Sequence, residues 1–202
     1  MSLCTLCAHL GKTCCQKTDV LLTPDDIERI RAHTGSSDFF ENRHPRDPGC
    51  LGGEDDPNWL LYTVHTDGSR TVVCHSRDGD CLFLAAEGCS LPCDVRPLIC
   101  RLHPLVYTES GIVGTSDDCP VRLLRGEDLL RSIGMDFEAG LRWHRQLYAE
   151  LDKGRGVNRH GAGPRRLHRE NGPECGRSQA EREREDPWES LWQRSERSPS
   201  AL

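Results

Sequence analysis

The sequence predicts an α+β fold: a small, irregular domain centred on cysteines and metal, with short hairpins and a few helices, followed by a disordered C-terminal tail. Two observations predict it. The 202 residues include 12 cysteines, and the apolar segments between them are short, so bound metal would supply stability that a thin core lacks. Helical and strand patterns also do not alternate, which argues against a parallel, doubly wound sheet.

The chain divides by composition near residue 152. Residues 1–152 hold nearly all of the apolar periodicity and form the predicted cysteine-cluster metal-binding domain. Residues 153–202 are a mixed-charge tail, rich in glycine and proline, without the aliphatic side chains that offset the entropy cost of ordering. In this tail Trp188, Leu191 and Trp192 share one face of a short helix, which is either a contact for a protein partner or a patch that packs on the domain.

Short elements are predicted along the first half of the domain. Thr23-Pro24-Asp25-Asp26 has the N-cap, proline and acidic first turn of a helix start, and Gly35 ends that helix. The phenylalanines at 39–40 indicate a second short helical piece or a turn. Residues 59–65 and 70–75 are predicted to be the two strands of a hairpin around an Asp-Gly turn.

The second half of the domain predicts another hairpin and two closing helices. The hairpin joins residues 105–109 to residues 112–115 through Ser110-Gly111. The closing helices span residues 127–133 and 136–151. The last of them has a buried stripe at helical spacing, formed by Phe137, Leu141, His144, Leu147 and Leu151.

Charge and hydropathy restrict the classes of function. Residues 153–202 hold 11 basic and 8 acidic side chains, so residues 1–152 carry a formal charge of −9 against −6 for the whole chain. Such an acidic domain does not favour nucleic-acid binding through a basic face. No secretory signal is visible, and no apolar stretch reaches the roughly 18 residues that cross a bilayer. We therefore expect a cytoplasmic protein that contacts neither nucleic acid nor membrane, in which clustered thiols act as metal ligands.

The first group of cysteines is Cys4-x2-Cys7-x6-Cys14-Cys15. A Cys-x-x-Cys pair turns both sulfurs toward one metal ion, although redox dithiols share that spacing. Adjacent cysteines rarely form a disulfide with each other, because the resulting ring is strained. One of Cys14 and Cys15 is therefore a candidate ligand, and the other is either a further ligand or a buried thiol.

The second group is Cys81-x7-Cys89-x3-Cys93-x6-Cys100, and Cys119 follows it. Glycines beside these thiols let the backbone approach an ion. Pro97 starts a short helix and Pro104 ends it, which fixes the orientation of Cys100. The spacing leaves the metal open: it is loose for a zinc ribbon, and it favours an iron–sulfur cluster, of the [4Fe-4S] type, over Zn.

Taken together, these motifs resemble the YkgJ-type cysteine-cluster family of zinc- or iron-chelating domains. That family combines a Cys-x-x-Cys-x-x-Cys-Cys start, a Cys-x-Phe-Leu element followed by Gly-Cys, and an Arg-Pro-x-x-Cys-Arg-x-x-Pro element. The chain matches over about residues 4–120, with Cys81-Leu82-Phe83-Leu84, Gly88-Cys89 and Arg96-Pro97-Leu98-Ile99-Cys100-Arg101-Leu102-His103-Pro104. Its start differs, since six residues rather than two separate Cys7 from Cys14. The candidate metal ligands are Cys4, Cys7, Cys14, Cys15, Cys81, Cys89, Cys100 and Cys119.

Two arginines beside Cys100 are candidate cofactor-binding residues. Arg96 and Arg101 could offset the charge of a thiolate cluster or hold a carboxylate or phosphate, or they could pair with Asp94 and Glu87. His103 is a ligand, a proton carrier or a structural residue. A general base and a third catalytic group are not identifiable. Cys50, Cys74, Cys93 and Cys175 fall outside the shared pattern.

The resemblance leaves more than one function open. It implies metal binding without an assigned biological role. A similar cysteine cluster occurs in flagellin lysine N-methylases, which implies an alternative: an iron–sulfur-assisted enzyme resembling a protein lysine methyltransferase. A disulfide-stabilised interaction domain is a third hypothesis, against which the adjacent cysteines and the missing signal peptide argue.

Overall fold

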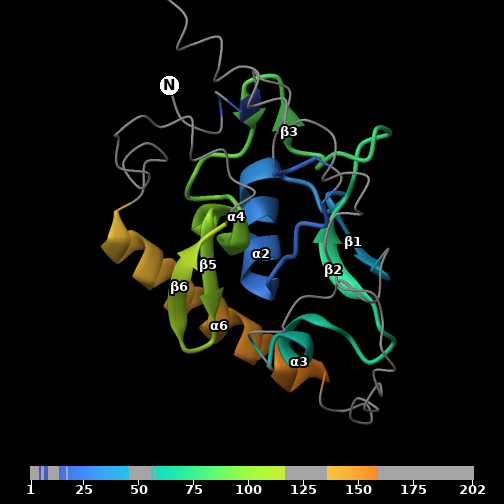
Figure 1. The fold of residues 1–202 in the computed structure, drawn as a ribbon. Coiled ribbons are helices and arrows are strands. Elements are labelled where there is room, and N and C mark those ends of the chain that lie inside the picture. The colour runs from blue at the N-terminus through green and yellow to red at the C-terminus, as the bar shows by residue number, and fades with distance from the viewer. Residues whose placement is uncertain are drawn as a thin grey trace, which may run out of the picture. The chain divides into compact units, whose positions relative to one another are not determined.

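The computed structural model describes residues 5, 7–8, 14–16, 18–45, 56, 58–116 and 136–158. All of them belong to Met1–Arg166, the first of the two units into which the chain divides. A few helices and three small antiparallel hairpins make up this unit, which confirms the predicted α+β class (Figure 1). Several predictions lie outside the described residues: the helix at 127–133, the tail beyond 158 with Trp188, Leu191 and Trp192, and the thiols of Cys4, Cys50, Cys119 and Cys175.

Helix α2 (Pro24–Thr34) begins and ends where the sequence predicts. The Thr23 side chain accepts a hydrogen bond from the Asp26 amide at 3.0 Å, and the Asp26 carboxylate accepts one from the Thr23 amide at 3.0 Å, which completes a capping box. At the other end Gly35 has a φ of 70°, a conformation that costs glycine little, and its amide bonds the Arg31 carbonyl. Ile30 is fully buried, so α2 is a core helix.

The described strands form three two-stranded antiparallel sheets. The hairpin predicted near residues 105–115 is confirmed as β5 and β6. The sheets are β1 (Phe40–Arg43) with β2 (Arg70–Val73), β3 (Leu84–Ala85) with β4 (Gly88–Cys89), and β5 (Leu105–Thr108) with β6 (Gly111–Thr115). None of these sheets is large enough to form a core alone, so the helices must supply the rest of the packing.

The prediction of a strand at residues 59–65 is wrong, because Trp59–Thr63 is helix α3. Its aromatic residues favour a strand locally, but Trp59 and Tyr62 instead pack their rings edge-on against Tyr148 of the last helix. The Asp-Gly turn does form, since the His65 amide bonds the Ser69 carbonyl at 2.8 Å. Strand β2 therefore pairs with β1. Of the helical piece or turn predicted at 39–40, the structure has a turn at Phe39, and Phe40 begins β1.

Helix α6 (Phe137–Asn158) matches the predicted closing helix but runs further, past the predicted end at residue 151. His144, Leu147 and Leu151 of the predicted stripe are buried. Phe137, in contrast, is 55% exposed, because it is the first residue of the helix and its side chain extends beyond the part of α6 that packs against the core. The boundary between domain and tail at residue 152 stays a prediction.

Two hydrophobic clusters form the core. The first joins helix α4 (Leu98–Leu102), β5 and α6, and consists of Leu98, Leu102, Leu105, Ala139, Leu147, Tyr148 and Leu151. The second lies around α2 and β2, and consists of Val20, Leu22, Ile30, Phe39, Val73, Cys81 and Leu91. Ile99 of α4 packs against both clusters. Each fully buried leucine contributes about 1.5–3 kcal/mol, and α4 is thus fixed between the two halves of the core.

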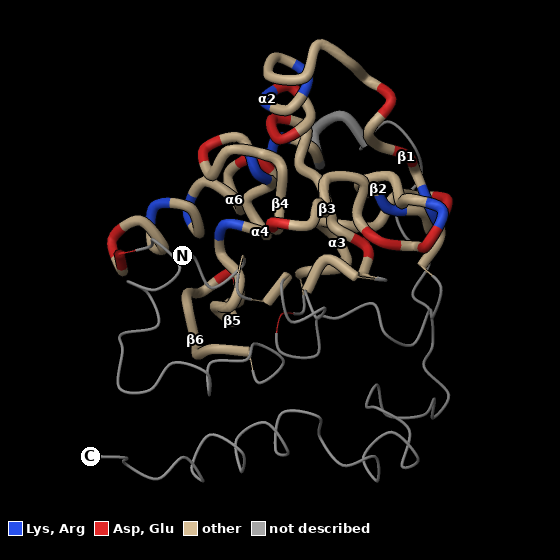
Figure 2. Tube along the Cα trace, turned by 90° about the horizontal axis from the view of Figure 1, so that it is seen from above, with Lys and Arg blue, Asp and Glu red and all other residues tan. Residues whose placement is uncertain are grey.

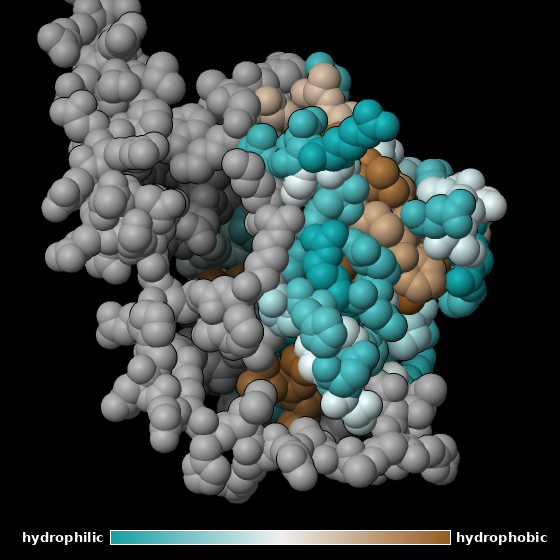
Figure 3. Space-filling model, turned by 90° about the vertical axis from the view of Figure 1, so that its right-hand side faces the viewer, coloured by the Kyte–Doolittle hydropathy of each residue, from teal (hydrophilic) through white to brown (hydrophobic). Residues whose placement is uncertain are grey.

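The surface of the described part is mixed in charge and mostly hydrophilic. Figure 2 shows acidic and basic residues interspersed along the trace. In Figure 3 the face on the β1–β2 side is largely hydrophilic, with apolar area confined to separate patches. Among the described residues, no helix combines the length and the hydropathy that a membrane span requires.

Candidate metal centre

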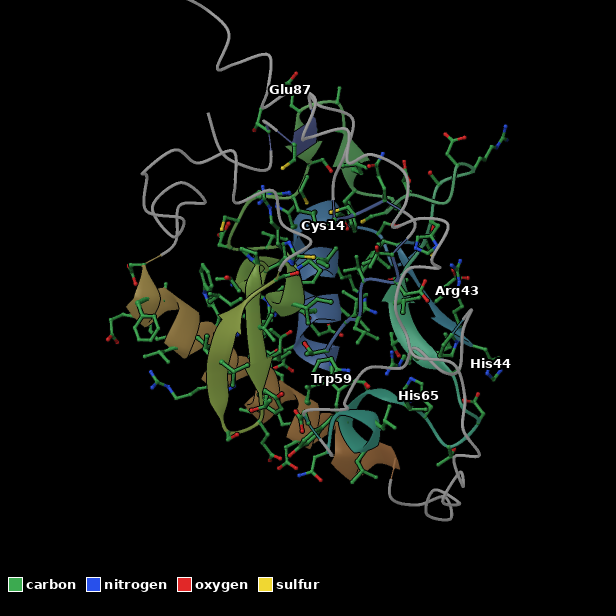
Figure 4. All side chains as sticks on the ribbon, in the orientation of Figure 1. Cys14, Arg43, His44, Trp59, His65 and Glu87 are labelled. Atoms are coloured by element: carbon green, nitrogen blue, oxygen red, sulfur yellow. The ribbon has the colours of Figure 1, made fainter. Side chains whose placement is uncertain are left out.

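Five of the eight predicted ligands, from four segments of the chain, meet beside the second hydrophobic cluster. They are Cys14, Cys15, Cys81, Cys89 and Cys100, which we call the thiol cluster. Each thiol of the cluster interacts electrostatically with at least two of the others. Figure 4 shows Cys14 near the end of α2 that is closer to Glu87, a residue of the β3–β4 hairpin.

The backbone explains why these segments meet. The Cys81 amide donates a hydrogen bond to the Cys15 carbonyl at 2.9 Å, which joins the two cysteine groups of the sequence directly. Cys89 ends the short strand β4, and the tight turn before it requires the positive φ of Gly88, 98°. Cys100 lies in the middle of α4. The Gly-Cys and Arg-Pro-x-x-Cys motifs are therefore geometric requirements of the thiol cluster.

The adjacent cysteines have opposite acidities. A hydrogen bond from the Cys15 thiol and one from His103 lower the pKa of Cys14 to about 4, although burial works against this. The same Cys14 interaction, together with burial, raises the pKa of Cys15 far above its usual range. The pair thus holds one proton between two sulfurs at neutral pH, which leaves one thiolate ready to bind a cation.

Burial is the main influence on the pKa values of Cys81 and Cys100. It raises the pKa of Cys81, and the neighbouring sulfur of Cys89 adds to this. The pKa of Cys100 lies well above its usual value, because the side chain is buried and faces the sulfurs of Cys14 and Cys81. A cation placed among these sulfurs would relieve the repulsion between their thiolate forms.

Three other described cysteines are not among the five of the thiol cluster. Cys7 is buried, and its role as a ligand stays a prediction. Cys74 lies near Glu41 and Arg43, and Cys93 is exposed. None of the eight described cysteines forms a disulfide. The separation of Cys74 agrees with its position outside the shared sequence pattern.

The comparison with known families agrees with this geometry. The chain matches the CxxCxxCC family, a putative zinc- or iron-chelating domain, over residues 3–120, which is more than half of its length. This chain belongs to the CxxCxxCC family. The resemblance seen in the sequence motifs is thereby confirmed, with nearly the same boundaries. Neither the comparison with curated proteins nor that with solved structures gives a match.

The cysteine sulfurs of this chain are suitable ligands for zinc and iron, the metals named for its family. Thiolates bind both zinc and iron, and the thiol cluster offers five cysteine sulfurs as donors. Within the described ranges, however, no three cysteine, histidine or carboxylate side chains are arranged as a formed metal site. The sulfurs of the thiol cluster would therefore have to move closer together to surround an ion.

The side chains of the two candidate cofactor-binding arginines donate hydrogen bonds to nearby backbone carbonyls. Arg96 Nε donates to the Leu91 carbonyl at 2.9 Å. Arg101, which is buried, donates from Nε to the Arg96 carbonyl at 2.8 Å and from Nη2 to the Asp94 carbonyl. Both arginines thus brace the segment that leads into α4. Their binding of a cofactor or substrate stays a prediction.

Two interactions escaped the sequence analysis. His103 bonds Cys14, which places it at the edge of the thiol cluster. The carboxylate of Asp26, which the sequence identifies only as part of a helix start, also accepts a hydrogen bond from the Leu98 amide at the beginning of α4. The sequence carries no signal for that contact, because 72 positions separate the two residues.

A cavity of about 180 Å³ is lined by no cysteine. Trp59, Ile99 and Leu147 are among its mostly apolar lining residues, and Figure 4 shows Trp59 and His65 well separated from Cys14. Its polar groups already bond one another: the Thr71 hydroxyl contacts His65 Nε2 at 2.8 Å and the Asn42 side chain at 2.9 Å. The cavity therefore offers little to orient a polar substrate.

Proposed function

We propose that this chain is a cytoplasmic protein that holds an iron–sulfur cluster, of the [4Fe-4S] type, or zinc in its place, through its clustered cysteines. The observation that carries the proposal is the thiol cluster, in which five cysteines from four segments of the chain interact next to the second hydrophobic cluster. We propose Cys4, Cys7 and Cys119 as further ligands. Metal is the partner that this arrangement suits best, since thiolates crowded together repel one another.

The residues of the chain have distinct roles in this proposal. Cys14, already a thiolate at neutral pH, makes the first contact with the cation. Cys15, Cys81 and Cys100 must each lose a proton before they bind. Arg101 and Arg96 would offset part of the negative charge of the thiolates. A bound iron–sulfur cluster would supply one-electron chemistry, and zinc would supply structural cross-linking.

Charge and redox state support the proposed location and partners. Free thiols persist in a reducing compartment such as the cytosol. The net charge of −6 and the interspersed charges in Figure 2 do not favour contact with the phosphates of nucleic acid. We propose that neither nucleic acid nor a membrane is a partner, and that Trp188, Leu191 and Trp192 offer a contact for another protein.

Metal analysis with absorption spectroscopy, on protein purified without oxygen, tests the proposal. An iron–sulfur protein should contain about four irons per chain and show a broad band near about 400 nm that bleaches on reduction. One or two zinc ions without colour would support the zinc form. Removal of either metal by a chelator should lower the thermal unfolding temperature, because the ligand thiols are then left buried without partners. Protein without metal under these conditions would contradict the proposal.

Single substitutions test the ligand assignment. Cys100→Ser and Cys89→Ser should abolish metal retention, because hydroxyl groups bind these soft metals poorly. Cys74→Ser is the matched control: it changes a described thiol that lies apart from the thiol cluster, near Glu41 and Arg43. Cys175→Ser, in the predicted tail, should also retain metal. Equal metal content in all four variants would contradict the assignment.

A further inference from the structure

The carboxylate of Asp26 lies fully buried where α2, α4 and α6 meet, and it has no exposed surface. It accepts hydrogen bonds from three groups: the Thr23 amide at 3.0 Å, the Leu98 amide at 3.1 Å and the guanidinium of Arg29. Burial raises the pKa of Asp26, while the Thr23 amide and Arg29 lower it. Burying a carboxylate costs free energy unless its oxygens accept hydrogen bonds. We therefore expect the protein to tolerate few other side chains at position 26.

The bond to Leu98 solves a specific problem of α4. This helix has only five residues, Leu98–Leu102, and its N-cap Pro97 makes no side-chain hydrogen bond to it. The first amides of a helix have no partner within the helix, and so short a helix is unstable alone. Asp26 supplies the missing acceptor from a helix 72 positions earlier in the chain.

The position of α4 determines the position of one proposed ligand. Cys100 follows Leu98 by two residues, less than one helical turn, so a shift of the Leu98 amide moves the Cys100 sulfur with it. Cys14 and Cys15 lie on the chain segment that leads into α2, the helix that contains Asp26. The Asp26–Leu98 bond therefore joins the helix that follows Cys14 and Cys15 in the chain to the helix that carries Cys100.

A second carboxylate, from α6, supports the first. Glu150 is 2% exposed and accepts hydrogen bonds from the Thr23 hydroxyl and from Arg29, whose Nη1 lies 2.7 Å from Glu150 Oε1. Arg29 thus bridges the carboxylates of Asp26 and Glu150. Glu150 lies beyond residue 120, where the match to the CxxCxxCC family ends. The support comes from a helix outside the family segment.

We propose that Asp26 is a positioning residue of the metal centre, which holds α4 so that Cys100 stands beside Cys14 and Cys81, and that Glu150 of α6 supports it through Arg29 and Thr23. This inference rests on the proposed function. Asp26 has no contact with the metal in this proposal. Its effect reaches the ion through the backbone of α4.

The experiment compares Asp26→Asn with Asp25→Asn, its matched control. Asp25 is the preceding residue of the same turn, but its carboxylate forms only a surface ion pair with Lys153, at 3.0 Å. Zinc affinity of the full chain is measured by competition with a chelator, at a temperature where circular dichroism shows each variant folded. We expect about a tenfold or greater loss of zinc affinity in Asp26→Asn, as for outer residues that orient metal ligands. Asp25→Asn should bind zinc like the unmodified chain.

A second readout separates positioning from stability. In the metal-free chain, Cys100 should be alkylated several-fold faster in Asp26→Asn than in Asp25→Asn, while Cys89, on the β3–β4 hairpin, keeps its rate. A general loss of stability would speed alkylation of both cysteines equally. Glu150→Gln should show the same pattern with a smaller change, because Asp26 keeps its bond to Leu98.

The outcomes distinguish this inference from the proposed function. Asp26→Asn with unchanged zinc affinity, or with Cys89 and Cys100 exposed equally, would overturn the positioning role. If Asp26→Asn does not fold, Glu150→Gln decides: weaker zinc binding supports the inference, and unchanged binding overturns it. If the unmodified chain binds zinc no more tightly than Cys100→Ser, the proposed function fails instead, whatever the Asp26 variant does.

Discussion

The thiol of Cys15 donates a hydrogen bond to the sulfur of Cys14, its neighbour in the sequence. This bond makes the pair unequal, with one thiolate and one thiol that is hard to ionise. The pair thus keeps one sulfur anionic in the metal-free chain.

The first prediction concerns the reactivity of Cys14 in the metal-free chain. Its lowered pKa, about 4, makes it a thiolate throughout the range from about pH 6 to 8, and part of its side chain is open to solvent although the rest is packed against the protein. The rate of its alkylation by iodoacetamide should therefore change little over that range. Mass spectrometry of peptides from chains alkylated at each pH measures this rate.

The variant Cys15→Ala tests the cause of that reactivity. Without the Cys15 donor, the pKa of Cys14 should rise, and its alkylation rate should climb with pH between about 6 and 8. Cys93→Ala is the control, because Cys93 is exposed and takes no part in the thiol pair. A rate that already climbs about tenfold per pH unit in the unmodified chain would contradict the assignment of the thiolate.

The second prediction concerns the pH dependence of zinc affinity. The pKa values of Cys81 and Cys100 are raised, so both thiols are protonated in the metal-free chain at neutral pH and must release protons on binding. Zinc affinity should therefore rise with pH, by up to about tenfold per pH unit for each proton released, and fall as the pH is lowered. Chelator competition at two pH values checks this, and titration calorimetry in buffers of different ionisation enthalpy counts the protons. An affinity independent of pH would show that these two thiols are not ligands.

Much of the thiol cluster could be predicted from the sequence because its signals are local. The Gly88-Cys89 pair and the prolines around Cys100 each set a turn or helix end within a few residues, and the structure confirms these elements. Helix α2 is confirmed for the same reason, since its capping box and Gly35 lie within its own sequence.

Contacts between distant segments could not be predicted in this way. The residues of α3 favour a strand on their own, and only the packing of Trp59 and Tyr62 against α6 explains the helix. Strand β1 contains charged and polar residues, and its pairing with β2 is visible only in the fold. The Asp26–Leu98 bond is of the same kind, because neither residue is unusual in its local sequence.

The third prediction concerns the end of α2. Gly35→Ala should lower the free energy of unfolding by about 1 kcal/mol, because an alanine at a φ of 70° is strained while no atom lies within 4 Å of the added methyl group. Gly114→Ala is the matched control: it also has open space around it, but its φ is not positive. Urea unfolding of both variants gives the difference. Equal effects would mean that backbone strain at Gly35 is not the cause.

The fourth prediction tests whether α6, which lies outside the family segment, is an integral part of the domain. The Tyr148 hydroxyl donates to Asp56 Oδ2 at 2.6 Å, and both residues are buried. Tyr148→Phe removes this donor from the buried carboxylate, which keeps the hydrogen bonds from the amides of Asn58 and Glu109. We expect a loss of about 1.5–3 kcal/mol in the free energy of unfolding, as for hydrogen bonds to charged groups.

Tyr62→Phe provides the comparison for this measurement. The Tyr62 hydroxyl also donates to a carboxylate, Glu109 Oε1 at 2.7 Å, but that bond is exposed to solvent. Water replaces the lost partner there, so the variant should lose no more than about 0.5 kcal/mol. Similar losses in the two variants would mean that α6 is bound to the rest of the domain only by its apolar face. The expected larger loss in Tyr148→Phe would mean that α6 belongs to the same folded unit as Cys100. Truncation of the chain before residue 137 should then weaken metal binding and also lower the free energy of unfolding.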